Sequence, residues 1–309
     1  MKRKMLNVPK GGYDGMKGFT IVEFLVAGLL SIIVLIAVVS SYFTSRKLND
    51  AANERLAEQQ DLRNAATLIV RDARMAGSFG CFNMSEHIKD VVVSDVPQKN
   101  YLFSLKKSNA NKLIPIAESP NINYQNFFQV SSALIFQYGI DDVNASDATT
   151  VVSSCAAISK PGKQIPTLED AKKELKIVSQ DKEQGNIARQ RHVVNAYAVG
   201  KIADEGGLFR FQLDDKGKWG NPQLLVKKVK RMKVRYIYVS GCPEDEDVGK
   251  EEQFKYTDKF DGSVTPAGVE VLLDSGSDAK IAASSDNIIY AYRINATIRG
   301  GNVCANRTL

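Results

Sequence analysis

The feature that most constrains this chain is a long apolar segment close to its start. The 22 residues from Phe24 to Ser45 carry no formal charge. About 20 apolar residues in a helix cross the hydrocarbon core of a bilayer, so this segment is long enough to span a membrane. A single carboxylate, Glu23, stands directly before Phe24, after the apolar pair Ile21-Val22. Because a carboxylate is costly to place in lipid, Glu23 is predicted to have a function.

A short basic segment precedes the apolar run and ends in Gly18. Its charged residues are Lys2, Arg3, Lys4, Lys10, Asp14 and Lys17. They sum to +4 of the formal net charge of +6, which leaves +2 for the rest of the chain. An excess of Lys and Arg before a membrane segment keeps that end in the cytoplasm. The part of the chain after the apolar run is therefore predicted to cross the membrane.

The order of Gly18, Phe19, an apolar run and an early Glu23 resembles the class III signal of type IV prepilins. In that family a membrane-embedded peptidase cuts after the glycine and N-methylates the new first residue. The resemblance implies a leader at residues 1–18, cleavage between Gly18 and Phe19, methylation of Phe19, and a role for Glu23 in subunit assembly. It also implies an α+β, pilin-like fold, in which a long N-terminal helix packs on a C-terminal antiparallel β-sheet domain.

Other interpretations of the N-terminus stay open. A secretory signal peptide or a plain signal anchor also places basic residues before an apolar run. A secretory peptide is cut after its apolar region, and Val39-Ser40-Ser41 is a poor but usable site for that cut. Neither alternative accounts for the Gly18-Phe19 pair or for Glu23 inside the run. Met16 is an alternative first residue, which would leave a leader of only three residues.

The first structural element is predicted to be one long helix, with a transmembrane half at residues 19–45 and an amphipathic half at residues 46–76. The apolar positions of the second half recur mostly at steps of three or four, as one helix face requires. They are Leu48, Ala52, Leu56, Leu62, Ala66, Ile69, Ala73 and Ala76. The charged residues, Asp72 among them, are assigned to the opposite, solvated face. Gly77 is expected to end the helix, and residues 77–309 are expected to form a β-rich globular domain.

Beyond the helix the pattern indicates strands and loops. Strands are predicted at residues 132–138, 193–199, 208–213, 229–239 and 288–298. The last two show alternation of apolar and polar residues, as half-buried strands do. Glu205-Gly206-Gly207 is predicted to be the turn of a hairpin between the second and third of these strands. A short helix with a capping-box-like start is predicted after Thr167. Residues 83–126 and 243–268 are predicted to be flexible loops.

The chain has four cysteines, and all of them follow the apolar run: Cys81, Cys155, Cys242 and Cys304. In an oxidising periplasm such cysteines form lasting disulfides. None of them forms a CxxC pattern, and four cysteines allow three pairings. We predict Cys81–Cys155 and Cys242–Cys304, because each pair would close its own half of the domain locally. Four buried free thiols are the alternative.

The resemblance extends past the leader. Residues 71–81 look like the helix-ending segment of PilW/PilJ-type minor pilins, and residues 207–210 and 225–236 resemble a later segment of the same proteins. Residues 225–236 are rich in lysine here, whereas the family usually shows a more acidic version. The matching motifs cover the first 81 residues and, less closely, residues 190–240; residues 82–190 have no match.

The sequence shows no motif for catalysis, a cofactor or a metal ion, so we predict that the protein is not an enzyme and has neither cofactor nor metal. His87 and His192 are the only histidines and lie far apart. The segment from Asp142 to Ser146 lacks the glycine and glutamate of a calcium loop, and the acidic residues 244–247 are assigned to a solvated loop. Few aromatic residues interleave with the basic residues between 227 and 235, so no nucleic-acid partner is predicted.

The resemblance implies a function in assembly. The protein would be a minor pilin that joins other minor pilins in a complex that primes type IV pilus polymerisation, at or near the filament tip. The implied partners are other minor pilins, the major pilin, the prepilin peptidase, the inner-membrane assembly platform and a tip adhesin. The implied location is a single pass through the inner membrane, with the N-terminus cytoplasmic and the globular domain periplasmic, and then the pilus tip at the cell surface. Two alternatives are a pseudopilin of a type II secretion system and, from another class, a membrane-anchored periplasmic binding domain.

Overall fold

The computed structural model describes residues 18, 20–84, 105, 113–177, 186–240, 253–274, 282–283, 289–290, 292–299 and 301. The chain divides into two compact units, Met1–Ala57 and Glu58–Leu309. The boundary falls inside helix α1 (Ile21–Met75), so the last turns of α1 belong to the second unit. The fold class is α+β, as predicted, because a long N-terminal helix precedes antiparallel sheets.

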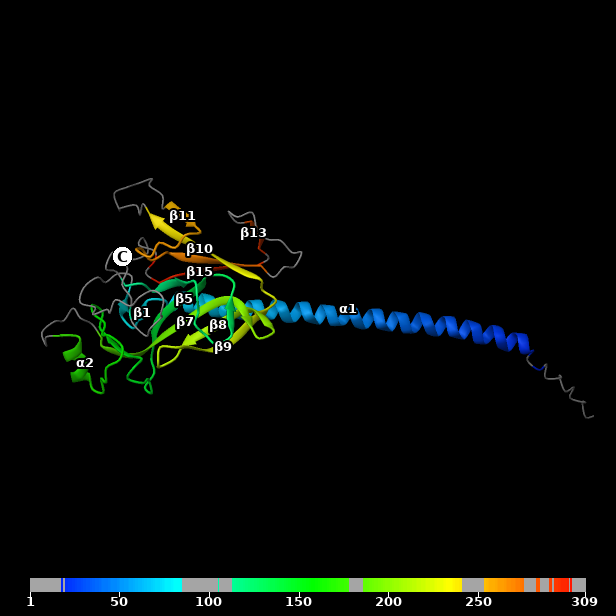
Figure 1. Cartoon of the computed structure of the whole chain (residues 1–309), viewed down its shortest axis with the longest axis horizontal. Helices are drawn as coiled ribbons and strands as arrows, with labels where there is room; N and C mark the ends of the chain where they lie inside the picture. Colours follow the sequence, from blue (N-terminus) through cyan, green and yellow to red (C-terminus); the bar gives the residue numbers. More distant parts are fainter. Residues whose placement is uncertain are drawn as a thin grey trace, which may run out of the picture. The chain divides into compact units, whose positions relative to one another are not determined.

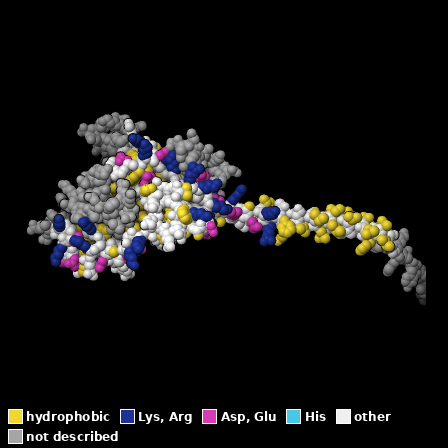
Figure 2. Space-filling model, in the orientation of Figure 1, with side chains coloured by type: hydrophobic (Ala, Val, Ile, Leu, Met, Phe, Trp, Pro, Cys, Tyr) yellow, Lys and Arg dark blue, Asp and Glu magenta, His cyan; other side chains and the backbone are white. Residues whose placement is uncertain are grey.

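The first unit contains the apolar part of α1. Every described residue of this unit is exposed, and Phe24 exposes 76% of its surface. Figure 2 shows hydrophobic side chains along this part of the helix. A window of 18 residues within α1 reaches a mean hydropathy of 2.9, so α1 is long and apolar enough to span a membrane.

The second unit contains two main antiparallel sheets (Figure 1). The larger sheet has the order β3-β5-β7-β8-β9, and β4 and β6 also pair with β7. Its strands are β3 (Ile116–Ser119), β4 (Phe127–Gln129), β5 (Ala133–Ile140), β6 (Thr150–Ser153), β7 (Ala188–Ile202), β8 (Glu205–Leu213) and β9 (Trp219–Lys227).

The smaller sheet has the order β11-β10-β12-β15. Its strands are β10 (Arg231–Ser240), β11 (Gln253–Thr257), β12 (Gly268–Asp274) and β15 (Tyr292–Thr297). The remaining elements are β1 (Ser78–Phe79), β2 (Phe82–Asn83), α2 (Leu168–Glu174), β13 (Ala282–Ala283) and β14 (Ile289–Tyr290).

Strand β7 organises the larger sheet, since β4 and β5 pair with successive parts of one edge and β6 and β8 with successive parts of the other. The predicted hairpin exists, but its predicted turn is wrong. The two strands meet through Ala203 and Asp204, and Ala203 has a φ of 51°. Gly206 and Gly207 lie within β8 instead. A Cβ at Gly207 would collide with the backbone oxygen of Val226, so this glycine allows β9 to approach β8 closely.

The first four predicted strands are confirmed, since β5, β7, β8 and β10 overlap them. The fifth is divided between β14 and β15. The two predicted loops are longer than the observed ones, because β3 lies within the first predicted loop and β11 within the second. Both are edge strands of four or five residues, too short to show a period. The short helix is confirmed as α2, and the Thr167 hydroxyl accepts a hydrogen bond from the backbone N–H of Asp170 at 3.1 Å.

One hydrophobic core joins the end of α1 to both sheets. It contains Leu62, Ala65 and Ile69 of α1, together with residues such as Phe136 of the larger sheet and Val271 of the smaller one. A second core covers the opposite face of the larger sheet. The alternation along β7 accounts for this division, because Tyr197 and Val199 belong to the first core, and Val194, Ala196 and Ala198 to the second.

The helix ends where the sequence predicts. Gly77 has a φ of 79°, and its N–H donates to the backbone oxygen of Gln137 in β5 at 2.8 Å. The chain then forms the β1–β2 hairpin, and a disulfide joins Cys81 to Cys155, the pairing that we predicted for these two cysteines. Cys242 and Cys304 lie outside the described residues.

The first prediction concerns the Cys81–Cys155 disulfide. It joins residues 74 positions apart, and in the chain-entropy account such a loop contributes about 4 kcal/mol by restricting the unfolded chain. The Cys81→Ala/Cys155→Ala variant should lose about that much free energy of unfolding. The measurement is urea unfolding of the full chain in detergent micelles, followed by the fluorescence of Trp219. This residue is buried and is the only tryptophan of the chain.

The single variants supply the control. Cys81→Ala and Cys155→Ala each remove the same cross-link, so each should cost nearly as much as the double variant. Additive costs of the two single changes, or a loss below about 1 kcal/mol, would contradict a stabilising disulfide.

Candidate functional site

The first candidate site is the N-terminal segment, where the sequence predicts processing and assembly. Gly18 is exposed, and no atom lies within 4 Å of the position that a Cβ would take there. The peptide bond after Gly18 is therefore not enclosed by the described residues. Phe19, the predicted new first residue, lies outside the described residues.

Glu23 closes a capping box at the start of α1. The backbone N–H of Thr20 donates to Oε2 of Glu23 at 2.9 Å, and the N–H of Glu23 donates to Oγ1 of Thr20 at 3.3 Å. The Thr20 hydroxyl also donates to Oε2 at 3.0 Å. Two backbone donors of the first helical turn are satisfied in this way. The spacing Thr20-x-x-Glu23 is typical of a capping box and is visible in the sequence. Our sequence analysis missed this capping role.

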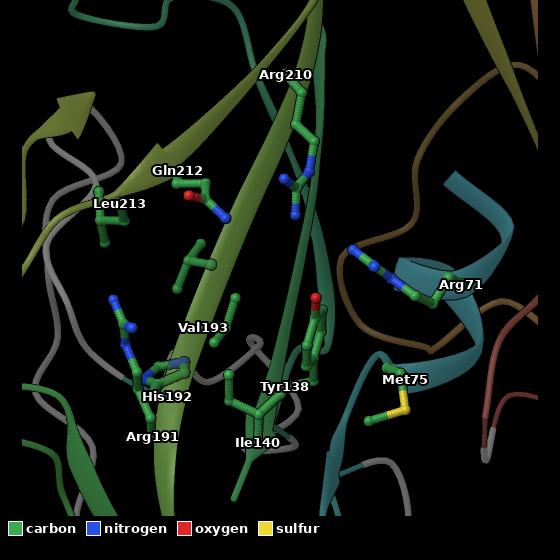
Figure 3. Close-up of a pocket in the computed structure, with 11 residues that line it drawn as sticks. Arg71, Met75, Tyr138, Ile140, Arg191, His192, Val193, Arg210, Gln212 and Leu213 are labelled. Atoms are coloured by element: carbon green, nitrogen blue, oxygen red, sulfur yellow. The ribbon is translucent and has the colours of Figure 1, made fainter. Parts of the chain in front are cut away.

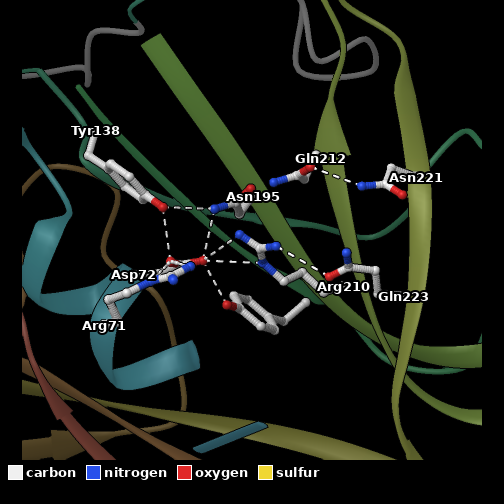
Figure 4. Close-up of polar contacts among 9 residues, drawn as sticks. Arg71, Asp72, Tyr138, Asn195, Arg210, Gln212, Asn221 and Gln223 are labelled. Atoms are coloured by element: carbon white, nitrogen blue, oxygen red, sulfur yellow. Dashed lines mark hydrogen bonds and ion pairs between the residues drawn. The ribbon is translucent and has the colours of Figure 1, made fainter. Parts of the chain in front are cut away.

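The second candidate site is a buried polar cluster around Asp72 (Figure 4). The Asp72 carboxylate is fully buried. Its Oδ1 accepts from the hydroxyl of Tyr138 at 2.9 Å and from Nη2 of Arg71 at 3.1 Å. Its Oδ2 accepts from the hydroxyl of Tyr197 at 2.7 Å and from Nδ2 of Asn195 at 2.8 Å. A buried carboxylate is tolerated only with such a set of donors.

Strand pairing assembles the donors of this cluster. Asn195 and Tyr197 are two residues apart on β7, so their side chains share the face that packs against α1. Arg210 of β8 lies directly opposite Tyr197, and its Nε and Nη2 are each 3.5 Å from Oδ2 of Asp72. Tyr138 comes from β5 on the other side of β7. Three neighbouring strands therefore point donors at one residue of the helix.

The burial of Asp72 corrects our sequence analysis, which placed this residue on the solvated face. Asp72 follows Ile69 by three positions and Ala65 by seven, and both of these are buried. A helix with 3.6 residues per turn brings all three to one face. The spacing therefore indicated that Asp72 is buried. We assigned Asp72 to the solvated face because its side chain is charged.

The environment sets the protonation of the neighbouring groups. Burial, followed by the charge of Asp72, raises the pKa of Tyr138 to about 12 and also raises the pKa of Tyr197. Both tyrosines therefore remain hydrogen-bond donors at neutral pH. Burial lowers the pKa of His192 to about 3, so this residue is neutral, and its Nε2 lies 2.9 Å from Oε1 of Gln137.

The cluster also brings together segments that are far apart in the chain. Asp72 belongs to residues 71–81 and Arg210 to residues 207–210, which are distant in sequence and meet in this ion pair. A pocket with a volume of ≈ 380 Å³ lies beside the cluster and is lined by Arg71, Arg191 and Arg210, among others (Figure 3). No sequence pattern indicated this pocket, because its walls come from α1 and from three strands.

The other polar segments that the sequence singled out make ordinary contacts. Oδ2 of Asp142 is 3.5 Å from Nη1 of Arg191, and its Oδ1 accepts from the backbone N–H of Asn144 at 2.9 Å. In the basic segment, Lys233 is 2.9 Å from Asp258. Residues 244–247 lie outside the described residues, and the described ranges contain no group of three or more His, Cys, Asp or Glu that could hold a metal ion.

Comparison of the chain with protein families, with curated proteins and with solved structures found no match.

The second prediction concerns the buried charge of Asp72. Asp72→Asn keeps the shape of the side chain but removes the charge, which leaves Arg71 and Arg210 without their carboxylate. Breaking a buried ion pair from one side costs about 3–5 kcal/mol, so the free energy of unfolding should fall by about that amount. Urea unfolding followed by Trp219 fluorescence measures the loss.

Asp204→Asn is the matched control, because it makes the same chemical change at a fully exposed carboxylate that pairs with Lys201 on the surface. Its effect should stay below about 1 kcal/mol. An equal loss of free energy of unfolding in the two variants would show that the burial of Asp72 does not increase the cost of removing its charge.

Proposed function

We propose that this chain is a minor pilin that joins other minor pilins in a complex that primes type IV pilus assembly at or near the filament tip. The observation that carries the proposal is the first part of α1, which exposes apolar side chains throughout and has Glu23 in its first turn. An apolar surface of this length requires a cover, which lipid supplies before assembly and the helices of neighbouring subunits supply afterwards.

The location that we propose follows from the same helix. The protein would cross the inner membrane once, with its basic leader in the cytoplasm and the globular part in the periplasm, and would then reach the pilus tip at the cell surface. The Cys81–Cys155 disulfide supports a periplasmic location, since disulfides persist in oxidising compartments. The proposed partners are other minor pilins, the major pilin, the prepilin peptidase, the inner-membrane assembly platform and a tip adhesin.

The proposed role is assembly rather than catalysis. A pseudopilin of a type II secretion system would use the same membrane helix, and deletion of the gene separates the two functions. Loss of surface pili supports the minor pilin, whereas loss of protein secretion with normal pili supports the pseudopilin. The pocket beside Asp72 favours a second candidate, a membrane-anchored periplasmic binding domain, for which the mature protein would retain its leader.

The third prediction tests processing. The mature protein should begin at Phe19 and carry an N-methyl group there, as mass spectrometry of the N-terminal peptide would show. Gly18→Glu should insert into the membrane but keep its leader, because a larger side chain at the cut would obstruct the peptidase. A mature protein that starts at any other residue would contradict the proposal.

The fourth prediction separates two roles of Glu23. As a charged group, Glu23 would pair with the N-terminal amine of a neighbouring mature subunit in the membrane, where an unpaired carboxylate is unfavourable. As a capping residue, it would only stabilise the first turn of α1. Glu23→Gln keeps the capping hydrogen bonds, because glutamine also closes a capping box, but removes the charge. Its recruitment into the minor-pilin complex should fall about tenfold, the effect of roughly 1.4 kcal/mol.

Thr20→Ala is the converse variant, since it removes the capping hydroxyl and keeps the charge of Glu23. Its recruitment should stay close to that of the unmodified protein. The measurement is a pull-down from detergent-solubilised membranes, together with a count of surface filaments. Normal recruitment of Glu23→Gln combined with loss in Thr20→Ala would assign Glu23 to capping alone.

A further inference from the structure

The pocket beside the Asp72 cluster has the size and the lining of a ligand site. Its volume of ≈ 380 Å³ lies in the range of small-molecule sites, roughly 300–1,000 Å³. Arg71 reaches it from α1, Arg191 from β7 and Arg210 from β8. In Figure 3 the side chains of Arg71 and Arg210 point toward a common space next to Tyr138. All of these residues belong to the second unit.

The charges around this space are unequal. Asp72 is the carboxylate that contacts both Arg71 and Arg210. Its shortest hydrogen bonds come from neutral groups, at 2.7 Å from Tyr197 and 2.8 Å from Asn195. One carboxylate, largely saturated by neutral donors, therefore faces two guanidinium groups. The Arg210 side chain is buried, whereas that of Arg71 is 54% exposed and reaches solvent. An excess of positive charge at such a partly buried position favours the binding of an anion.

Arg210 is the clearest sign of an unfilled site. Its side chain is only 8% exposed. Its contacts with Gln223 and Asp72 are long, with Nη1 3.4 Å from Oε1 of Gln223 and Nη2 3.5 Å from Oδ2 of Asp72. It also interacts with the hydroxyl of Tyr197. The Nε atom makes no hydrogen bond within the part of the chain that the structure describes, although it lies 3.5 Å from the same Asp72 oxygen. A guanidinium has five N–H donors, and a buried donor that lacks a good acceptor requires an explanation.

Arg191 can supply a third contact. Its side chain is 40% exposed, and its ion pairs are long, at 3.5 Å to Asp142 and 3.8 Å to Asp215. Exposed pairs of this kind contribute little, so the guanidinium can turn toward a ligand at small cost. The neighbouring His192 is neutral and adds no charge.

The remaining lining combines polar side chains, such as Gln212 and His192, with apolar ones. Ile140, Val193 and Leu213 contribute aliphatic surface to the same pocket, and Met75 adds a thioether. Inorganic phosphate or sulfate would leave this surface without a partner. A molecule with one carboxylate and an apolar body satisfies both parts of the lining, because guanidinium groups match the geometry of a carboxylate.

We propose that this pocket binds a small free organic carboxylate, with its charged end between Arg71, Arg191 and Arg210 and its apolar body against Ile140, Val193 and Leu213. This binding does not depend on the assembly function proposed above. It would add a ligand-dependent property to the globular part of the protein.

The test uses the full chain in neutral detergent micelles and 4-fluorobenzoate as the probe, with binding followed by ¹⁹F NMR. The probe should bind saturably, and its amide, 4-fluorobenzamide, should bind at least about tenfold more weakly, because a charge-assisted hydrogen bond contributes that much or more. Inorganic phosphate should also bind more weakly than the probe. If the amide bound with the same affinity as the probe, the negative charge would have no role in binding. If phosphate bound with the same affinity, the apolar side chains of Ile140, Val193 and Leu213 would have none.

Arg191→Gln is the variant of choice, because Arg191 does not contact Asp72 and its ion pairs lie at the surface. It should weaken 4-fluorobenzoate binding about tenfold or more. Lys201→Gln is the matched control on the same strand, since it removes one exposed charge that pairs with Asp204 outside the pocket. Unchanged binding in Arg191→Gln, an equal loss in Lys201→Gln, or no saturable binding to the unmodified protein would each overturn the proposal. Unfolding followed by Trp219 checks that both variants fold.

Discussion

A carboxylate buried between a helix and a sheet determines how the second unit is put together. Asp72 requires donors on every side, and they come from β5, β7 and β8. Those donors converge only if α1 presents one face to the sheet and the strands keep one register. A slip of one residue in β7 would turn Asn195 and Tyr197 to the opposite face of the sheet. The cluster therefore specifies an arrangement that hydrophobic contacts alone would define less sharply.

The remaining features of this unit are consistent with that arrangement. The core around Leu62, Ala65 and Ile69 joins α1 to both sheets, Gly77 ends the helix against β5, and the Cys81–Cys155 disulfide ties the following hairpin to the region after β6. The earlier part of α1 has no such contacts within its own unit and exposes its apolar side chains. One helix thus serves two environments, which is what the proposed assembly of membrane helices into a filament would require.

Much of this fold follows from local patterns. The long helix, its end at Gly77, the strands β5, β7, β8 and β10 and the start of α2 each depend on residues close in sequence, and all were predicted. The predicted hairpin turn was wrong because Gly206 and Gly207 lie within β8, where Gly207 allows the close approach of β9. The short edge strands β3 and β11 carry too few residues to show a period. The donors around Asp72 and the pocket could not be assigned, because they depend on which strands come together in space. The burial of Asp72 itself could have been predicted, since helical spacing alone places it beside Ile69.

A double-mutant cycle measures how far the stabilising contributions of Asp72 and Arg210 depend on one another. Arg210→Gln should lower the free energy of unfolding in the unmodified protein, because Asp72 then loses a cationic partner. In the Asp72→Asn background the same substitution should be neutral or stabilising, because Arg210 is then a buried charge without a counterion. We expect a coupling free energy of about 1–3 kcal/mol between the two residues. An equal cost of Arg210→Gln in both backgrounds would contradict it.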